Sequence, residues 1–182
     1  MITESDNFVL TGEEKIEYLI RRQILLQDVR DEVEGFHQFQ ARAYREGDRF
    51  FGVVRDDGSV IDHNYYPFWL FRDLIGNQID VRLSGGSAAQ RDQLLSIAAT
   101  ADDRMSTVVY LPLGASGAMD VTVESVVPAA LADGLVLVSR VSAEESGVVR
   151  AELNDAAAHR TDSIRLVPGT GVAVTILEEN PP

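Results

Sequence analysis

The sequence contains no cysteine among its 182 residues. Disulfide bonds, thiolate metal sites and cysteine nucleophiles are therefore excluded. No apolar run approaches the roughly 18 residues that a membrane-spanning helix requires. The first ten residues are polar and acidic, so we expect neither a secretory signal nor a transit peptide there. These absences predict a protein of the cytoplasm or of a virion that does not span a membrane.

Motifs that carry a known reaction are missing as well. The three histidines, His37, His63 and His159, lie far apart and show no metal-ligand spacing. Gly85-Gly86-Ser87 lacks the lysine of a phosphate-binding loop, and residues 114–117 miss the nucleophile-elbow pattern by one residue. We therefore predict no catalytic residues, no metal site and no cofactor, and a protein that is not an enzyme.

Lysine is almost absent, and the charge is strongly acidic. Lys15 is the only lysine among 16 basic residues, which face 29 acidic ones and leave a net charge of -13. Such a surface repels itself in dilute buffer and is screened in strong salt, which favours a salt-rich cytoplasm. A GC-rich genome, which encodes arginine in place of lysine, is the alternative explanation. In either case the charge opposes binding to nucleic acid and to anionic membranes.

The N-terminal part shows signals of helices and strands in mixture. Residues 1–10 resemble an extended arm, and a capping box at Thr11 predicts a long helix over 11–34. Asp56-Asp57-Gly58 predicts the turn of a β-hairpin over 49–65, in preference to a calcium loop. A second capping box at Ser87 predicts a helix over 87–99. We assign these elements to an α+β domain of residues 1–103.

The remaining part, residues 104–182, has the pattern of a β-domain. Strands are expected near 105–111, 118–127, 134–141, 147–153, 163–167 and 171–178. Short strands separated by turn residues at this spacing are typical of a sandwich or barrel. The predicted fold class is therefore α+β, with an N-terminal helix and a small mixed α/β region followed by an all-β sandwich or barrel-like module.

Two features suggest a surface that binds other protein subunits. In the expected helix 11–34, Leu19, Leu26 and Val33 lie seven residues apart on an apolar face that is broader than one core requires. Five of the 13 aromatic residues lie close together, namely Tyr65, Tyr66, Phe68, Trp69 and Phe71. These eight residues are the candidate interface, because aromatic side chains dominate binding hot spots. The alternatives are that they form the domain core, or that the aromatic group is a stacking platform for a carbohydrate or a base.

These observations lead to two functional hypotheses. The first is a structural protein that forms a homo-oligomer within a large symmetric particle. A neck, tail or capsid-surface component of a tailed virus of a halophilic archaeon would fit. The second is a module that binds a small molecule or a peptide, or an enzyme with a weak signature. In that case its acids would act at the rim of the sandwich, with Glu124, Asp120 and Glu152 as candidates.

Overall fold

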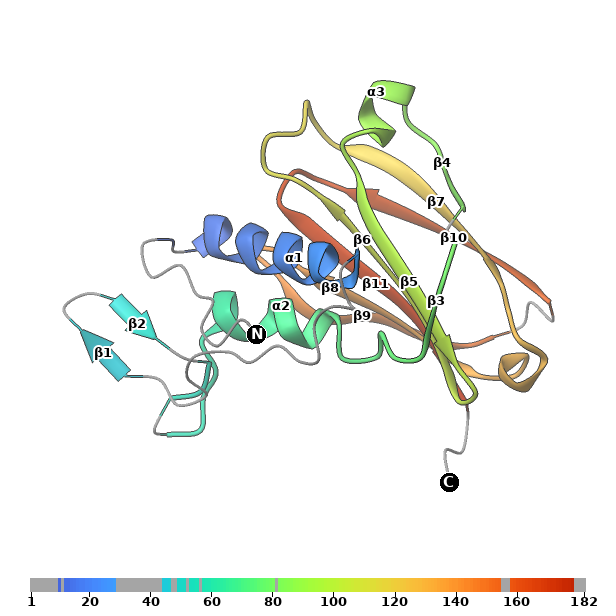
Figure 1. Cartoon of the computed structure of the whole chain (residues 1–182), viewed down its shortest axis with the longest axis horizontal. Coiled ribbons are helices and arrows are strands. Elements are labelled where there is room, and N and C mark those ends of the chain that lie inside the picture. The colour runs from blue at the N-terminus through green and yellow to red at the C-terminus, as the bar shows by residue number, and fades with distance from the viewer. Residues whose placement is uncertain are drawn as a thin grey trace.

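A computed structural model describes residue 10 and residues 12–28, 44–46, 49–51, 53–55, 57–80, 82–154 and 158–178. The described chain is mostly β-strand, arranged as two antiparallel sheets with two helices against one of them (Figure 1). The predicted α+β class is wrong, because strands from both halves of the sequence build the same two sheets. No helix in the described part is long and apolar enough to cross a membrane.

The larger sheet, sheet A, has six strands in the order β3-β5-β6-β11-β8-β9. Their bounds are β3 (Asn77–Ile79), β5 (Leu95–Ala101), β6 (Arg104–Leu111), β11 (Thr170–Leu177), β8 (Leu135–Val141) and β9 (Ser146–Leu153). The smaller sheet, sheet B, contains β10 (His159–Leu166), β7 (Met119–Val126) and β4 (Arg82–Ser84), in that order. Two short strands, β1 (Tyr44–Glu46) and β2 (Arg49–Phe51), pair only with each other.

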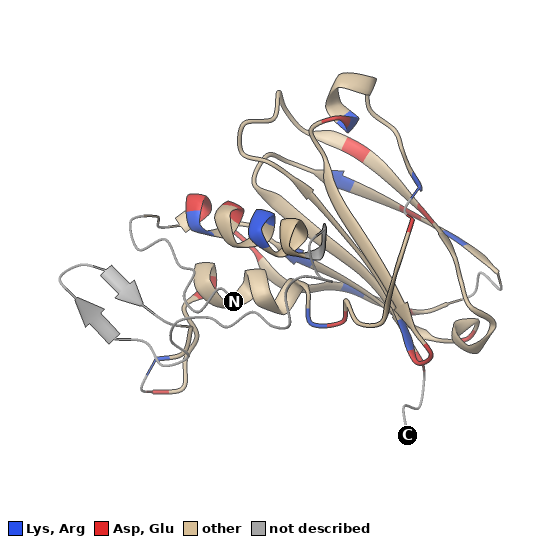
Figure 2. Ribbon diagram, viewed as in Figure 1, with Lys and Arg blue, Asp and Glu red and all other residues tan. Residues whose placement is uncertain are grey.

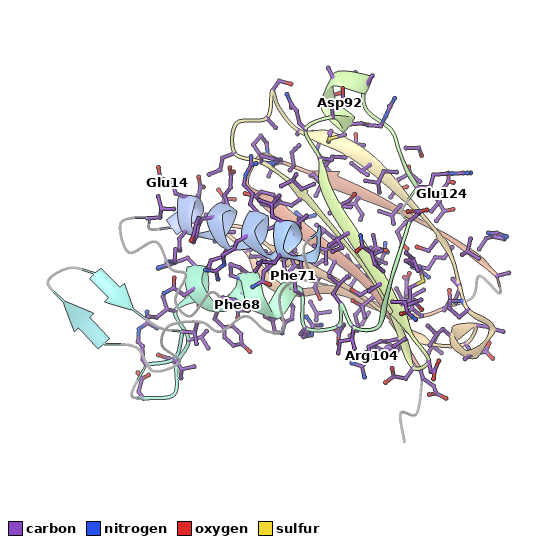
Figure 3. The ribbon with its side chains drawn as sticks, viewed as in Figure 1. Glu14, Phe68, Phe71, Asp92, Arg104 and Glu124 are labelled. Atoms are coloured by element: carbon purple, nitrogen blue, oxygen red, sulfur yellow. The ribbon has the colours of Figure 1, made fainter. Side chains whose placement is uncertain are left out.

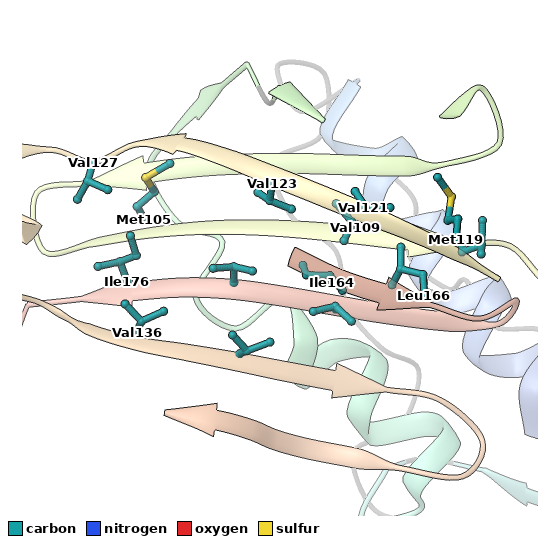
Figure 4. Packing of buried hydrophobic residues seen from close by; sticks show 14 of the residues in the cluster. Met105, Val109, Met119, Val121, Val123, Val127, Val136, Ile164, Leu166 and Ile176 are labelled. Atoms are coloured by element: carbon teal, nitrogen blue, oxygen red, sulfur yellow. The ribbon is translucent and has the colours of Figure 1, made fainter. Parts of the chain in front are cut away.

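Sheets A and B pack face to face around the main hydrophobic core. Strand β7 alternates strictly, so that Val121 and Val123 are buried while the residues between them face outward. They meet inward residues of sheet A such as Val109 and Val174. Figure 4 shows side chains of β7 and β10 lying against those of β6, β11 and β8. The strands expected over 105–111 and 118–127 thus supply inward residues of this core, as β6 and β7.

A second core lies on the opposite face of sheet A, under the helices α1 (Gly12–Asp28) and α2 (Asp62–Leu70). Ile20 of α1 and Leu70 of α2 pack there against Tyr110 and Ala173 of the sheet. Because β6 and β11 carry apolar residues on both faces, they lie in the middle of a three-layered molecule.

The helix expected over 87–99 is mostly a strand. Its capping box is confirmed: Ser87 and Gln90 exchange hydrogen bonds at the start of α3 (Ala88–Arg91). The helix ends there, and Leu95–Ala101 forms β5 between β3 and β6. Pairing on both sides and burial of Ile97 outweigh the helix propensity of its alanines.

The hairpin expected over 49–65 is shorter than predicted. Val54 and Val60 form a single antiparallel bridge, and Asp57 accepts hydrogen bonds from the backbone and hydroxyl of Ser59 within the turn. From Asp62 onward the chain is helical as α2, with Pro67 inside the helix. Aromatic side chains that pack on sheet A hold this segment as a helix.

Other expectations are met in part or lie outside the described residues. The helix expected over 11–34 is observed over Gly12–Asp28, and its remainder lies outside them, as does most of the N-terminal arm. The expected sandwich strands correspond to β6 to β11, although β10 begins at His159, before the expected start. The proposed domain boundary near residue 103 falls in the turn between β5 and β6.

Candidate ligand-binding cleft

A cleft of about 760 Å³ opens between the two sheets. Three strands of sheet B cannot cover six strands of sheet A, so the inner face of sheet A stays partly open toward β3 and β5. From sheet A the cleft is lined by Ile79, Thr100, Met105 and Thr107. Its volume lies within the range of about 300–1,000 Å³ that is usual for small-molecule sites.

One side of the cleft is bounded by the crossing from one sheet to the other. Strand β3 ends at Ile79 in sheet A, and β4 begins at Arg82 in sheet B. Asp80 lies in this short connection and lines the cleft; Figure 1 shows the chain running from β3 to β4. The chain thus changes from one sheet to the other between β3 and β4, and this change helps to form the site.

Two hydroxyl groups lie in the interior of the cleft. Thr107 on β6 and Ser125 on β7 occupy inward positions of the two facing sheets, and the two residues are 3% and 7% exposed. No hydrogen bond joins either hydroxyl to the described part of the chain, and neither oxygen is fully enclosed, so both face the open space of the cleft. These two are therefore available to a bound molecule.

Arg160 of β10 forms the inner wall beside them. It lies opposite Ser125 in the register of sheet B, and its side chain is buried. Its Nε donates to Asp162 Oδ2 at 2.8 Å and its Nη2 to Asp162 Oδ1 at 2.8 Å. Nη2 also contacts Glu152 of β9, and Arg150 contacts the same Asp162. The hydrogen bonds that Arg160 donates to Asp162 and Glu152 raise its pKa, so the guanidinium stays charged and occupied by these partners.

The rim of the cleft carries charges of both signs. Glu124 lies directly opposite Arg82 on β4 and Thr161 on β10 in the register of sheet B. Asp80 adds a second exposed carboxylate, and His159 lies at the other end of the rim. Figure 3 places Glu124 beside β4, on the sheet B side of the molecule. Figure 2 shows that acidic and basic residues are interspersed along the described ribbon.

The three acids proposed from the sequence have different surroundings. Glu124 lines the cleft, as the second hypothesis required of a rim acid. Glu152 binds Arg160 and so supports the wall of the cleft. Asp120 pairs with Arg165 in a bridge of two exposed side chains, outside the cleft.

The described candidate interface residues belong to the helix layer on the other side of sheet A, where Figure 3 labels Phe68 and Phe71. Leu19 is fully buried, Leu26 is half-buried on α1, and Val33 lies outside the described residues. The aromatic group belongs to α2 and the turn after it. Its members Tyr65, Tyr66, Phe68, Trp69 and Phe71 are half-buried.

These aromatic rings pack edge to face and against a cation. Tyr66 and Trp69 form a T-shaped pair with centroids 5.6 Å apart. The guanidinium of Arg72 lies 4.0 Å from the Trp69 ring centre. Tyr66, Trp69 and Phe71 also pack against the core under the helices. The aromatic group thus covers the outer face of sheet A and does not reach the cleft.

Sequence reasoning missed Thr107, Ser125 and Arg160. A polar residue at an inward position of an alternating strand was the available signal. Ser125 follows Val121 and Val123 in that alternation. A serine there is more often satisfied within the core, so only the position of the facing sheet identifies it as a cleft residue.

No protein-family model and no curated protein matches the sequence. Three solved structures resemble the fold over almost the whole chain. A GH39 enzyme from Xanthomonas axonopodis pv. citri matches with a TM-score of 0.65 and 13% identity, over 97% of this chain and 44% of its own. A GH30 endoxylanase from Clostridium papyrosolvens matches with a TM-score of 0.64 and 10% identity, over 97% and 41%.

The third is a monomeric β-xylosidase from Caulobacter crescentus, with a TM-score of 0.59 and 13% identity, over 98% of this chain and 45% of its own. The chain therefore spans less than half the length of each of these enzymes. At such identity the likeness establishes a shared fold.

The prediction of a non-enzymatic virion subunit is overturned by these comparisons, because the matching folds are those of glycoside hydrolases. Acidic charge and a broad helix face are compatible with many functions, and the lack of a local motif does not exclude a site assembled from distant strands.

Proposed function

We propose that this chain is a β-sandwich domain of the glycoside-hydrolase type that takes part in the breakdown of glycans. The observation that carries the proposal is the match of 97–98% of the chain to three glycoside hydrolases. Two of these are described as an endoxylanase and a β-xylosidase, so β-linked xylose oligomers are the substrate class to test first.

The inter-sheet cleft is the proposed glycan site. A sugar presents hydroxyl groups that donate and accept hydrogen bonds, and between them C–H groups that pack on apolar surface. The cleft offers both kinds of partner: the hydroxyls of Thr107 and Ser125, and the apolar side chains of Ile79, Leu83 and Met105. Site shape of this kind, mostly apolar with a few placed polar groups, is general for small-molecule recognition.

The test is titration of the chain with xylotriose in an isothermal calorimeter, with sucrose as the matched control sugar. Saturable binding of xylotriose that is blocked by Leu83→Trp, which would fill the cleft, is the expected result. Ser163→Trp, on the outer face of sheet B, is the control variant and should bind as the natural chain does. Failure of xylotriose, cellotriose and mannotriose to bind would overturn the proposed glycan site.

A finer candidate is that the cleft itself cleaves the glycan. It is favoured by the two exposed carboxylates at one rim, Asp80 and Glu124, because glycosidases use a pair of Asp or Glu residues. In such a reaction one carboxylic acid gives its proton to the departing glycosidic oxygen. The other carboxylate accepts a proton from the water whose oxygen bonds to the anomeric carbon.

Hydrolysis of xylotriose and of 4-nitrophenyl β-xyloside measures this second candidate. Activity that falls by a hundredfold or more in both Asp80→Asn and Glu124→Gln would support it, since general acid–base groups contribute about 10²–10⁴-fold. Asp120→Asn is the matched control on the same sheet. Activity that survives both substitutions, or no activity at all, would assign the cleft to binding alone.

A further inference from the structure

We infer that Thr107 and Ser125 form the floor of a subsite that buries one neutral sugar residue between the two sheets. This inference rests on the proposed glycan function and names the residues and the ligand class of the same cleft. It starts from two residues that are each more than nine-tenths buried, line the cleft, and whose hydroxyls have no hydrogen-bond partner within the described residues.

The position of the two hydroxyls is set by the strands that carry them. Thr107 follows Met105 on the inner face of sheet A, and Ser125 follows Val123 on the inner face of sheet B. A ligand that reaches both must therefore enter between the sheets. Each hydroxyl can donate one hydrogen bond and accept others, which is the pattern that complements sugar hydroxyls.

The neighbouring cation, Arg160, is not available to bind an acidic ligand. The guanidinium of Arg160 is already bonded to Asp162 and Glu152, and its Nη1 lies 3.5 Å from Asn154 Oδ1. An arginine that recognises a carboxylate does so through a free pair of N–H groups, and these are committed here. Arg160 therefore acts as a positioning residue of the wall.

The rim also disfavours an anion. Asp80 and Glu124 carry negative charge at the entrance, and the positive charge of Arg82 faces Glu124 across neighbouring strands. A uronic acid would bring a further negative charge close to these carboxylates, whereas a neutral pentose or hexose would not. The subsite is thus built for a neutral sugar.

The experiment compares xylotriose with trigalacturonate, a charged trisaccharide, by calorimetric titration of the full chain. The natural chain should bind xylotriose at least tenfold more tightly. Thr107→Val and Ser125→Ala should each weaken xylotriose binding by about threefold to tenfold, the range for loss of one hydrogen bond. Their melting temperatures should stay equal, because neither hydroxyl has a hydrogen-bond partner in the described protein that the substitution would remove.

Thr122→Val and Ser163→Ala make the same chemical changes on the outer face of sheet B and should leave affinity unchanged. If the natural chain binds xylotriose and the two cleft variants bind it equally well, the subsite is overturned while the glycan function stands. A fall in melting temperature that parallels the loss of affinity would show a structural role and also overturn it. Equal affinity for trigalacturonate and xylotriose would show that the subsite does not prefer a neutral sugar. If no saccharide binds, the glycan function itself is overturned.

Discussion

Glu17 links helix α1 to sheet A through two hydrogen bonds at one carboxylate oxygen. The hydroxyl of Tyr110 donates to Glu17 Oε2 at 3.1 Å, and the backbone N–H of Leu113 donates to the same oxygen at 2.6 Å. Burial raises the pKa of Tyr110, and the charge of Glu17 raises it further, so the phenol remains a donor. A buried donor and a half-buried acceptor therefore fix where the helix lies on the sheet.

At this residue scale, Tyr110→Phe should lower the free energy of unfolding by about 1 kcal/mol, the usual value of one hydrogen bond. Glu17→Ala should cost more, about 2 kcal/mol or above, because it leaves both the Tyr110 hydroxyl and the Leu113 N–H without a partner. Urea denaturation measures both. Equal costs for the two variants would contradict this account of the link.

At the scale of elements, the close packing of the helices on sheet A depends on a glycine in β11, Gly171. A Cβ on Gly171 would lie 2.8 Å from Leu70 Cδ2 and 3.2 Å from Ile20 Cδ1, so the glycine lets both helices approach the sheet closely. Neighbouring Ala173 is also small and is buried in the same core. The helices are thus positioned by small residues of the strand beneath them.

Gly171→Val should therefore lower the free energy of unfolding by about 1–3 kcal/mol, the usual cost of overpacking a core. Gly114 has open space around its Cβ position, so Gly114→Val is the matched control and should cost well under that. Thermal or urea unfolding of the two variants side by side is the measurement. If Gly114→Val were as destabilising as Gly171→Val, close packing of the helices at Gly171 would not be the cause.

Strands β9 and β10 are joined across the two sheets by a network of Arg150, Glu152, Arg160 and Asp162. Asp162 is 2% exposed and forms salt bridges with both arginines. On the same sheet, Asp120 and Arg165 form a pair in which both side chains are exposed. Arg160–Asp162 is a buried Arg–Asp pair and Arg165–Asp120 is an exposed one. Their contributions to stability can therefore be compared directly.

Asp162→Ala should destabilise the fold by about 3 kcal/mol or more, because it leaves a buried guanidinium without its main partner. Asp120→Ala should cost less than about 1 kcal/mol, as exposed pairs contribute little. Denaturant unfolding in the same buffer measures the difference. If both variants lost a similar free energy of unfolding, burial of the network would not determine its contribution to stability.

At the scale of the whole molecule, the net charge of -13 opposes folding wherever it is not screened. The free energy of unfolding should therefore rise when KCl is increased from about 0.1 M to 1 M, as the Debye length falls from about 10 Å to 3 Å. Sorbitol at matched osmolality is the control for effects other than screening. Stability that stays level with salt, or rises equally in sorbitol, would show that charge repulsion is not a significant term.

The sequence by itself determined the local features of this protein. The capping box at Ser87 and the turn at Asp57-Gly58 are set by contacts within a few residues, and both were predicted correctly. The helical nature of residues 12–28 follows in the same way from the apolar spacing along one face.

The tertiary structure decided which sheet each strand joins, and with it the site. Leu95–Ala101 became a strand because β3 and β6 pair with it on both sides, although its alanines favour helix. Thr107 and Ser125 are 18 positions apart in sequence, and it is the packing of sheet B on sheet A that brings both to one cleft. Pairing and packing act between distant residues, so no local pattern could encode that these two hydroxyls face the same cleft.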